Sequence, residues 1–157
     1  MSSRLNYQGS EIGTKVYKGL LAANKAVMSS TLPHSIAHLV EIRASQINGC
    51  AFCIDMHTKD AVHEGESHQR LHLVAGWREA TVFTEAERVA LELAEQGTRI
   101  ADAAGGVPDE VWANAVKHFD EDQLAALVSL IALINSWNRL NVILQNPAGD
   151  YVPGQYS

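Results

Sequence analysis

The chain has 157 residues, a length that favours one domain over two. Hydrophobic residues make up 46% of it and charged residues 19%, which is the balance of an ordinary globular protein. The 12 Lys and Arg stand against 18 Asp and Glu, so the net charge is −6, and no run of basic residues occurs. Because phosphate binding needs a concentrated positive field, this composition argues against a nucleic-acid partner.

Secreted and membrane proteins are also not expected. Residues 1–7 lack the apolar core of a secretory signal. The longest apolar stretch, residues 124–134, is about half as long as the ~20 residues that a membrane span needs. We therefore expect a cytoplasmic protein without a membrane partner.

Helix signals recur along the whole chain, and seven helices are predicted in order, over residues 10–28, 33–48, 50–64, 66–74, 84–102, 108–118 and 120–145. Ser10 and Asp120 are of the residue types that cap a helix N-terminus, and Pro33 suits a first turn. The pair Asn48-Gly49 closes the second helix, since glycine usually follows the last helical residue.

The clearest start signal is the capping box of Thr84 and Glu87, whose side chains satisfy each other's free backbone N–H groups. The last predicted helix is apolar almost all round, so it should be buried on most sides, partly against another subunit. No segment shows the sustained alternation of a half-buried strand. The sequence therefore predicts an all-α, single-domain helical bundle over 1–157, in which residues 147–157 form a C-terminal arm or a disordered tail.

Cys50, Cys53 and His57 carry the most informative chemistry. If a helix begins near Cys50, the three side chains fall at i, i+3 and i+7 and share one face. The partial positive charge of a helix N-terminus favours a thiolate over a thiol. A thiolate that attacks a peroxide becomes a sulfenic acid, the second cysteine converts it to a disulfide, and a dithiol reductant resets the pair.

Other interpretations of the pair stay open. Two cysteines and a histidine are zinc ligand types, and His38 could supply a fourth ligand through space, although no second ligand pair of the usual spacing follows. The cysteines could also be buried helix residues that happen to lie three apart. A thioredoxin-like fold is disfavoured, because there the Cys-x-x-Cys follows a strand.

The same segment resembles the core of alkylhydroperoxidase D, within the carboxymuconolactone decarboxylase-like superfamily. The resemblance is carried by residues 39–57, Leu-Val-Glu-Ile-Arg-Ala-Ser-Gln-Ile-Asn-Gly-Cys-Ala-Phe-Cys-Ile-Asp-Met-His. Weaker similarity continues through residues 58–61, 76–80 and 83–88. The resemblance implies an all-α fold, a homo-oligomer, and reduction of hydroperoxides by thiols without a cofactor.

The resemblance also assigns roles to the three residues. In that family the second cysteine attacks the peroxide, the first resolves it, and the following histidine assists proton transfer. These roles fall on Cys53, Cys50 and His57 respectively.

Two positions depart from the family pattern. The peroxidases carry a glutamate where this chain has His38, and a histidine where it has Phe52. His38 can still relay protons, because its ordinary pKa is about 6.5. The nearest carboxylate, Glu41, is one helical turn away, and Asp60 lies one turn beyond His57, where it either orients that imidazole or stays solvated.

The sequence thus predicts a thiol-dependent hydroperoxide reductase with Cys53, Cys50, His57 and His38 as its catalytic residues. Its expected partners are a hydroperoxide substrate and a dithiol reductant of the lipoyl or thioredoxin type. The alternative function is a redox-sensing or zinc-binding helical module without efficient peroxide turnover. A lactone decarboxylase is a poor interpretation, because that branch of the superfamily lacks the cysteine pair.

Overall fold

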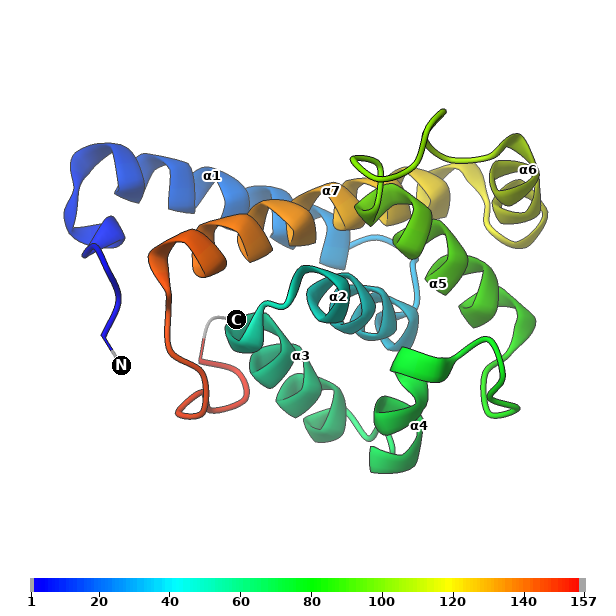
Figure 1. Cartoon of the computed structure of the whole chain (residues 1–157), viewed down its shortest axis with the longest axis horizontal. Coiled ribbons are helices and arrows are strands. Elements are labelled where there is room, and N and C mark those ends of the chain that lie inside the picture. Colours follow the sequence, from blue (N-terminus) through cyan, green and yellow to red (C-terminus); the bar gives the residue numbers. More distant parts are fainter. Residues whose placement is uncertain (1, 156–157) are drawn as a thin grey trace.

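Seven α-helices and two short 3₁₀ helices follow one another along residues 2–155, the part of the chain that the computed structural model describes, and no strand occurs among them (Figure 1). Their bounds are η1 (Tyr7–Gly9), α1 (Glu11–Met28), α2 (His34–Asn48), α3 (Ala51–His63), α4 (His68–Leu73), η2 (Val74–Gly76), α5 (Glu85–Thr98), α6 (Asp109–His118) and α7 (Glu121–Leu144). The predicted all-α, single-domain fold is therefore confirmed.

Six helix starts lie within about one residue of their predictions, whereas α4 begins at His68, two residues after its predicted start, and local capping explains several of the six. Ser10 accepts a hydrogen bond from the backbone N–H of Gly13 at 3.0 Å. The side chains of Thr84 and Asp120 accept in the same way, and each forms a reciprocal capping box with the residue three positions on. Each cap satisfies N–H groups that the helix itself leaves unpaired.

One helix end differs from its prediction. The α5 helix stops at Thr98, before the predicted end near residue 102. The Thr98 hydroxyl accepts a hydrogen bond from Asn135 of α7 at 3.1 Å, and this contact attaches the end of α5 to α7. The residues that follow form turns through Gly105 and Gly106, both at positive φ. This ending depends on a contact between distant parts of the chain, which local pattern does not reveal.

The α2 helix is central, and it packs against α3, α5 and α7 (Figure 1). Nine of its positions are buried, and three of these carry polar side chains, His38, Glu41 and Ser45. The long α1 and α7 helices contact each other and run in opposite directions along one side of the molecule. The fold thus surrounds a group of polar residues on α2 with helices from several parts of the chain.

The α7 helix is the most apolar element of the described chain. It is the one helix there with the length and hydropathy of a membrane span, with a mean hydropathy of 1.4 over its best 18-residue window. Half of that window is buried inside the fold. Its apolar character therefore serves the core, where Leu127, Leu130 and Ile134 are at most 1% exposed.

After α7 the chain turns back along α3. Lys59 of α3 donates to the backbone carbonyl of Gly149 at 2.8 Å, and Asp55 accepts from the Gly149 N–H at 3.0 Å. The Tyr151 hydroxyl donates to Asp60 at 2.8 Å. Of the segment predicted as an arm or a disordered tail, residues 147–155 thus form an arm on the chain's own α3, and residues 156–157 lie outside the described part.

Candidate active site

The junction of α2 and α3 positions the cysteine pair. Gly49 adopts a left-handed conformation with φ of 65°, which lets α2 end in a tight turn. Cys50 is then the N-cap residue of α3, and Cys53 and His57 lie within that helix. All three side chains are buried, with residue exposures of 1%, 0% and 7% respectively. The structure therefore brings together the three residues that the sequence placed on one helix face.

The two thiols are free and interact directly. The Cys53 side chain donates a hydrogen bond to the Cys50 sulfur, and this lowers the pKa of Cys50 to about 7 despite the opposing effect of burial. The same interaction, together with burial, raises the pKa of Cys53 far above that of an ordinary thiol. When the pair loses one proton, the negative charge is therefore favoured on Cys50 and the remaining proton on Cys53.

Two asparagines of α7 complete the surroundings of the sulfurs. The Asn141 amide donates to the Cys53 sulfur at 3.3 Å. Asn138 favours the thiolate form of both cysteines and also donates to the Ser45 hydroxyl at 3.0 Å. Sequence reasoning missed both residues, although Asn135, Asn138 and Asn141 recur every three residues in an otherwise apolar helix. That spacing is the signal of a buried polar stripe.

Glu41 of α2 supplies the carboxylate of the site. Its Oε2 atom lies 3.0 Å from Nδ1 of His57. Burial lowers the pKa of His57, but the charge and hydrogen bond of Glu41 outweigh this effect, and the pKa is raised overall. Glu41 therefore favours the protonated form of the imidazole beside the Cys50 sulfur. Sequence reasoning noted Glu41 as the nearest carboxylate but did not include it among the catalytic residues.

His38 of α2 is a second histidine close to Glu41. Its Nδ1 atom is 3.8 Å from Glu41 Oε2, and its Nε2 atom is 3.2 Å from Glu64 Oε2. His38 and Glu64 line a small pocket of about 170 Å³. The Glu64 side chain is 46% exposed, whereas those of His38 and Glu41 are at most 8% exposed. A line of ionisable groups therefore leads from His57 to the surface.

Asp60 was expected either to orient His57 or to stay solvated, and it does neither. It accepts the hydrogen bond of the Tyr151 hydroxyl, and burial together with this contact raises the pKa of Tyr151 to about 12. Its charge acts on His57 more weakly than that of Glu41 does. Asp60 thus serves mainly to fix the C-terminal arm, and Glu41 orients the imidazole.

The spacing of the relay residues would also suit a metal ion. Among residues 2–155, one set of three His, Cys, Asp or Glu side chains has ligand atoms within 4.8 Å of one another, and it consists of His38, Glu41 and His57. Nε2 of His57 is buried without a hydrogen-bond partner, and the two ring nitrogens of His38 form no hydrogen bond although each lies near a carboxylate oxygen. The cysteines are not part of this set, so it differs from the zinc site that the sequence suggested.

Comparisons with known proteins agree with this architecture. The model of the carboxymuconolactone decarboxylase family matches residues 14–96. The chain is 40% identical to the uncharacterized protein YdfG of Bacillus subtilis over 94% of its own length and 98% of that protein's. A crystal structure of a protein of unknown function from Agrobacterium tumefaciens, suggested to be the antioxidant defence protein AhpD, has a TM-score of 0.88 and 37% identity. It covers 96% of this chain and 100% of that one.

A more distant likeness shows the fold alone. The debrominase Bmp8 superposes with a TM-score of 0.73 at 18% identity, over 86% of this chain and 70% of that one. The family match, the extended identity and the shared fold confirm the resemblance that residues 39–57 suggest. The chain belongs to the carboxymuconolactone decarboxylase family and has its alkylhydroperoxidase D-like core.

Proposed function

We propose that the protein is a thiol-dependent hydroperoxide reductase that works without a cofactor in a reducing, cytoplasmic environment. The observation that carries the proposal is the hydrogen-bonded pair of Cys50 and Cys53 beside the ion pair of His57 and Glu41. A thiolate, a second thiol and a protonated base are the groups that peroxide reduction needs. The suggested antioxidant role of the Agrobacterium relative supports the same chemistry.

The reaction begins at the resting thiolate–thiol pair. Cys53 passes its proton to Cys50, and its sulfur attacks the terminal oxygen of ROOH, so that an S–O bond forms and the O–O bond breaks. The departing alkoxide takes the proton of the His57 imidazolium and leaves as the alcohol. Cys50 then displaces hydroxide from the sulfenic sulfur, and the Cys50 proton leaves with it as water. The products are an alcohol, water and a Cys50–Cys53 disulfide.

This sequence consumes one proton from solvent in each oxidation. Reduction of the disulfide by a dithiol returns the pair to one thiolate and one thiol, and it releases one proton. Because His57 is buried, these protons need a route to the surface. The arrangement of Glu41, His38 and Glu64 supports such a route, which keeps a role for His38 in the relay.

The test is peroxide consumption with several dithiol donors, including lipoyl and thioredoxin-like ones. Cys53→Ser should abolish turnover, because it removes the attacking sulfur. Cys50→Ser should allow a single oxidation that stops at the sulfenic acid, which a dimedone-type probe traps. Thr58→Ser, on the same helix, is the matched control and should keep full activity. Unchanged turnover in Cys53→Ser would refute the proposal.

A second function is favoured by the spacing of His38, Glu41 and His57. In that case the protein is a zinc-binding or redox-sensing module, and peroxide oxidises its thiols without turnover. Metal analysis of the same purified sample separates the two functions. About one equivalent of zinc together with no dithiol-dependent turnover would favour the module, and metal-free active protein would favour the reductase.

A further inference from the structure

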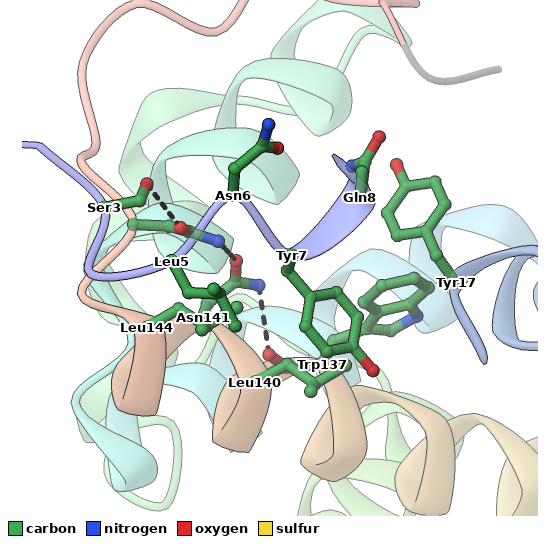
Figure 2. A pocket seen from close by; sticks show the side chains of 11 residues that line it. Ser3, Leu5, Asn6, Tyr7, Gln8, Tyr17, Trp137, Leu140, Asn141 and Leu144 are labelled. Carbon is green, nitrogen blue, oxygen red and sulfur yellow. Dashed lines mark hydrogen bonds between the residues drawn. The ribbon is translucent and has the colours of Figure 1, made fainter. Parts of the chain in front are cut away.

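Two pockets lie next to the residues of the site. A pocket of about 430 Å³ between the N-terminal segment and α7 adjoins the Cys53 sulfur through Asn141, so it belongs to the redox centre already described (Figure 2). The pocket of about 170 Å³ lies at the other end of the line of ionisable groups, where His38 meets Glu64. A water molecule in the liquid takes up roughly 30 Å³, so this smaller pocket has room for an ion with a few waters.

Two histidines of α2 face the same carboxylate oxygen at the smaller pocket. His34 and His38 are four residues apart, so they lie on one side of the helix. The Nδ1 atom of His34 is 3.5 Å from Oε2 of Glu64, and Nε2 of His38 is 3.2 Å from the same oxygen. A tetrahedral zinc site, with bonds of about 2.0–2.2 Å, separates its ligand atoms by roughly 3.3 Å. Both distances to Glu64 therefore suit a shared ion.

The opposite ring nitrogen of each histidine faces an acceptor. Nε2 of His34 lies 3.1 Å from the Met28 carbonyl, which can only accept, so this nitrogen carries the proton. In the neutral ring, Nδ1 then has a free lone pair on the side of Glu64. Nδ1 of His38 lies 3.8 Å from Oε2 of Glu41. Metal-binding histidines usually direct their other nitrogen at a carbonyl or a carboxylate in this way, because that contact fixes the tautomer of the ring.

His38 is the buried member of this group. The residue is 6% exposed, it lines the pocket, and neither of its ring nitrogens forms a hydrogen bond. Buried polar groups are normally hydrogen-bonded, so an imidazole in this state is consistent with a ligand that the pocket holds. The side chains of His34 and Glu64 are 50% and 46% exposed, which leaves the group open to an ion from solution.

The charges around the pocket also favour a cation. Glu64 is the C-cap residue of α3, so the partial negative charge of that helix end is at the pocket. It opposes the partial positive charge of the α2 N-terminus, where His34 lies. Glu66 lines the pocket as well, although its charge is shared with Arg70 at 2.9 Å. Two imidazoles and a carboxylate are a ligand set that suits zinc and leaves a fourth position for water.

We propose that Nδ1 of His34, Nε2 of His38 and a carboxylate oxygen of Glu64 bind one zinc ion, with water as the fourth ligand. Unlike the set that includes His57, these three residues do not have all their ligand atoms within 4.8 Å of one another, so the half-exposed His34 ring has to turn inward to complete the site. The site uses the ring nitrogen of His38 that faces Glu64, and it does not depend on the proposed reductase.

The test is isothermal titration calorimetry of the full chain with zinc chloride at neutral pH. The wild type should bind about one equivalent. His34→Gln and Glu64→Gln each remove one ligand and should weaken binding at least about tenfold, since even the loss of a group that only orients a ligand costs about 10–100-fold. His72→Gln is the matched control, because His68 and His72 form an exposed pair of the same spacing on α4, and it should leave binding unchanged. Weakened binding in His72→Gln but not in His34→Gln would overturn the proposal.

Two further variants distinguish this site from the other zinc ligand types of the chain. Cys50→Ser/Cys53→Ser removes the thiols, and His57→Gln removes a member of the other set of ligand atoms. Both variants should still bind about one equivalent. Loss of binding in either of them, with unchanged binding in His34→Gln, would place the ion at the redox centre and overturn the proposal. A wild type that binds no zinc would overturn it too. Because the titration contains no peroxide, a failure of the proposed reductase would leave the result unaffected.

Discussion

The two cysteines are chemically unequal, although they occupy neighbouring turns. Cys50 has its pKa lowered to about 7 chiefly by the hydrogen bond from Cys53, while the pKa of Cys53 is raised. The family resemblance nevertheless names Cys53, not Cys50, as the attacking thiol. Both observations agree if Cys50 acts first as the base that removes the Cys53 proton. The lowered pKa thus belongs to the partner of the attacking sulfur.

The pKa of Cys50 gives a direct prediction. Thiolate absorbance near 240 nm should rise with pH around a midpoint of about 7, and this step should be absent in Cys50→Ser. An ordinary thiol is only a few per cent ionised at neutral pH. Cys53→Ala should raise the midpoint by about one to two pH units, because a hydrogen bond to a charged group contributes roughly 1.5–3 kcal/mol.

Cys53→Ser is the matched control for this titration. It keeps a donor next to Cys50, so its midpoint should stay close to that of the wild type. A wild-type midpoint of about 8.5, the usual pKa of a free cysteine, would contradict the assignment of the negative charge to Cys50.

At the scale of elements, α7 is a core helix that also carries a polar stripe of asparagines. Its asparagines face α2 and α3 at the point where the redox pair lies. Asn138 is fully buried, donates to Ser45 and accepts from Asn48 at 2.9 Å. These bonds join α7 to α2 beneath the cysteines, so the same helix holds the fold together and supplies donors to the sulfurs.

Asn138→Leu should therefore lower stability and alter the site together. The substitution removes one hydrogen bond from the Ser45 hydroxyl and one from the Asn48 amide, and this loss should lower the free energy of unfolding by about 1–3 kcal/mol. It should also raise the pKa of Cys50, because the Asn138 amide favours the thiolate. Urea denaturation and the thiolate titration measure the two effects. Ser136→Ala, elsewhere on α7, should stay within about 0.5 kcal/mol of the wild type. If the two variants were equally stable, the proposed contribution of the buried asparagines of α7 to stability would be wrong.

At the scale of the whole molecule, apolar side chains are exposed on the two long helices. Ile12 and Val16 on α1 are 68% and 39% exposed, and Val142 and Ile143 on α7 are 47% and 64% exposed. The two pairs lie at the same end of the molecule, since α1 begins near the end of α7 (Figure 1). Exposed apolar groups of this kind mark protein interfaces. They support the homo-oligomer that the sequence predicts.

The double variant Ile12→Asp/Ile143→Asp should dissociate that oligomer. Introducing charges into an apolar interface leaves them buried without partners. Light scattering coupled to size-exclusion chromatography should then give the monomer mass of 17.1 kDa. Ile100→Asp, at a position that is 57% exposed between α5 and α6, is the control and should keep the oligomer mass. A monomeric wild type would contradict the prediction.

Three of the four site residues that the sequence predicts lie on α3 or at its N-cap, and the fourth, His38, lies on α2. Cys50, Cys53 and His57 are set by spacing within α3, and the helix starts are set by local caps, so both follow from nearby residues. Glu41 and Asn141 come from α2 and α7, and only packing of those helices brings them to the pair. The end of α5 was missed for the same reason, because a contact with α7 determines it.

The burial of both sulfurs also limits the shape of the reductant. Neither cysteine is more than 1% exposed, so the incoming thiol has to travel beneath the surface to reach the disulfide. A slender dithiol group, such as a lipoyl group on a flexible side chain, can reach the buried disulfide, whereas a thiol fixed on a rigid protein surface is kept away from it by the surrounding residues. We therefore expect bulky cellular thiols to reduce the Cys50–Cys53 disulfide slowly. Efficient reduction should need a dithiol narrow enough to pass between the side chains that cover the sulfurs.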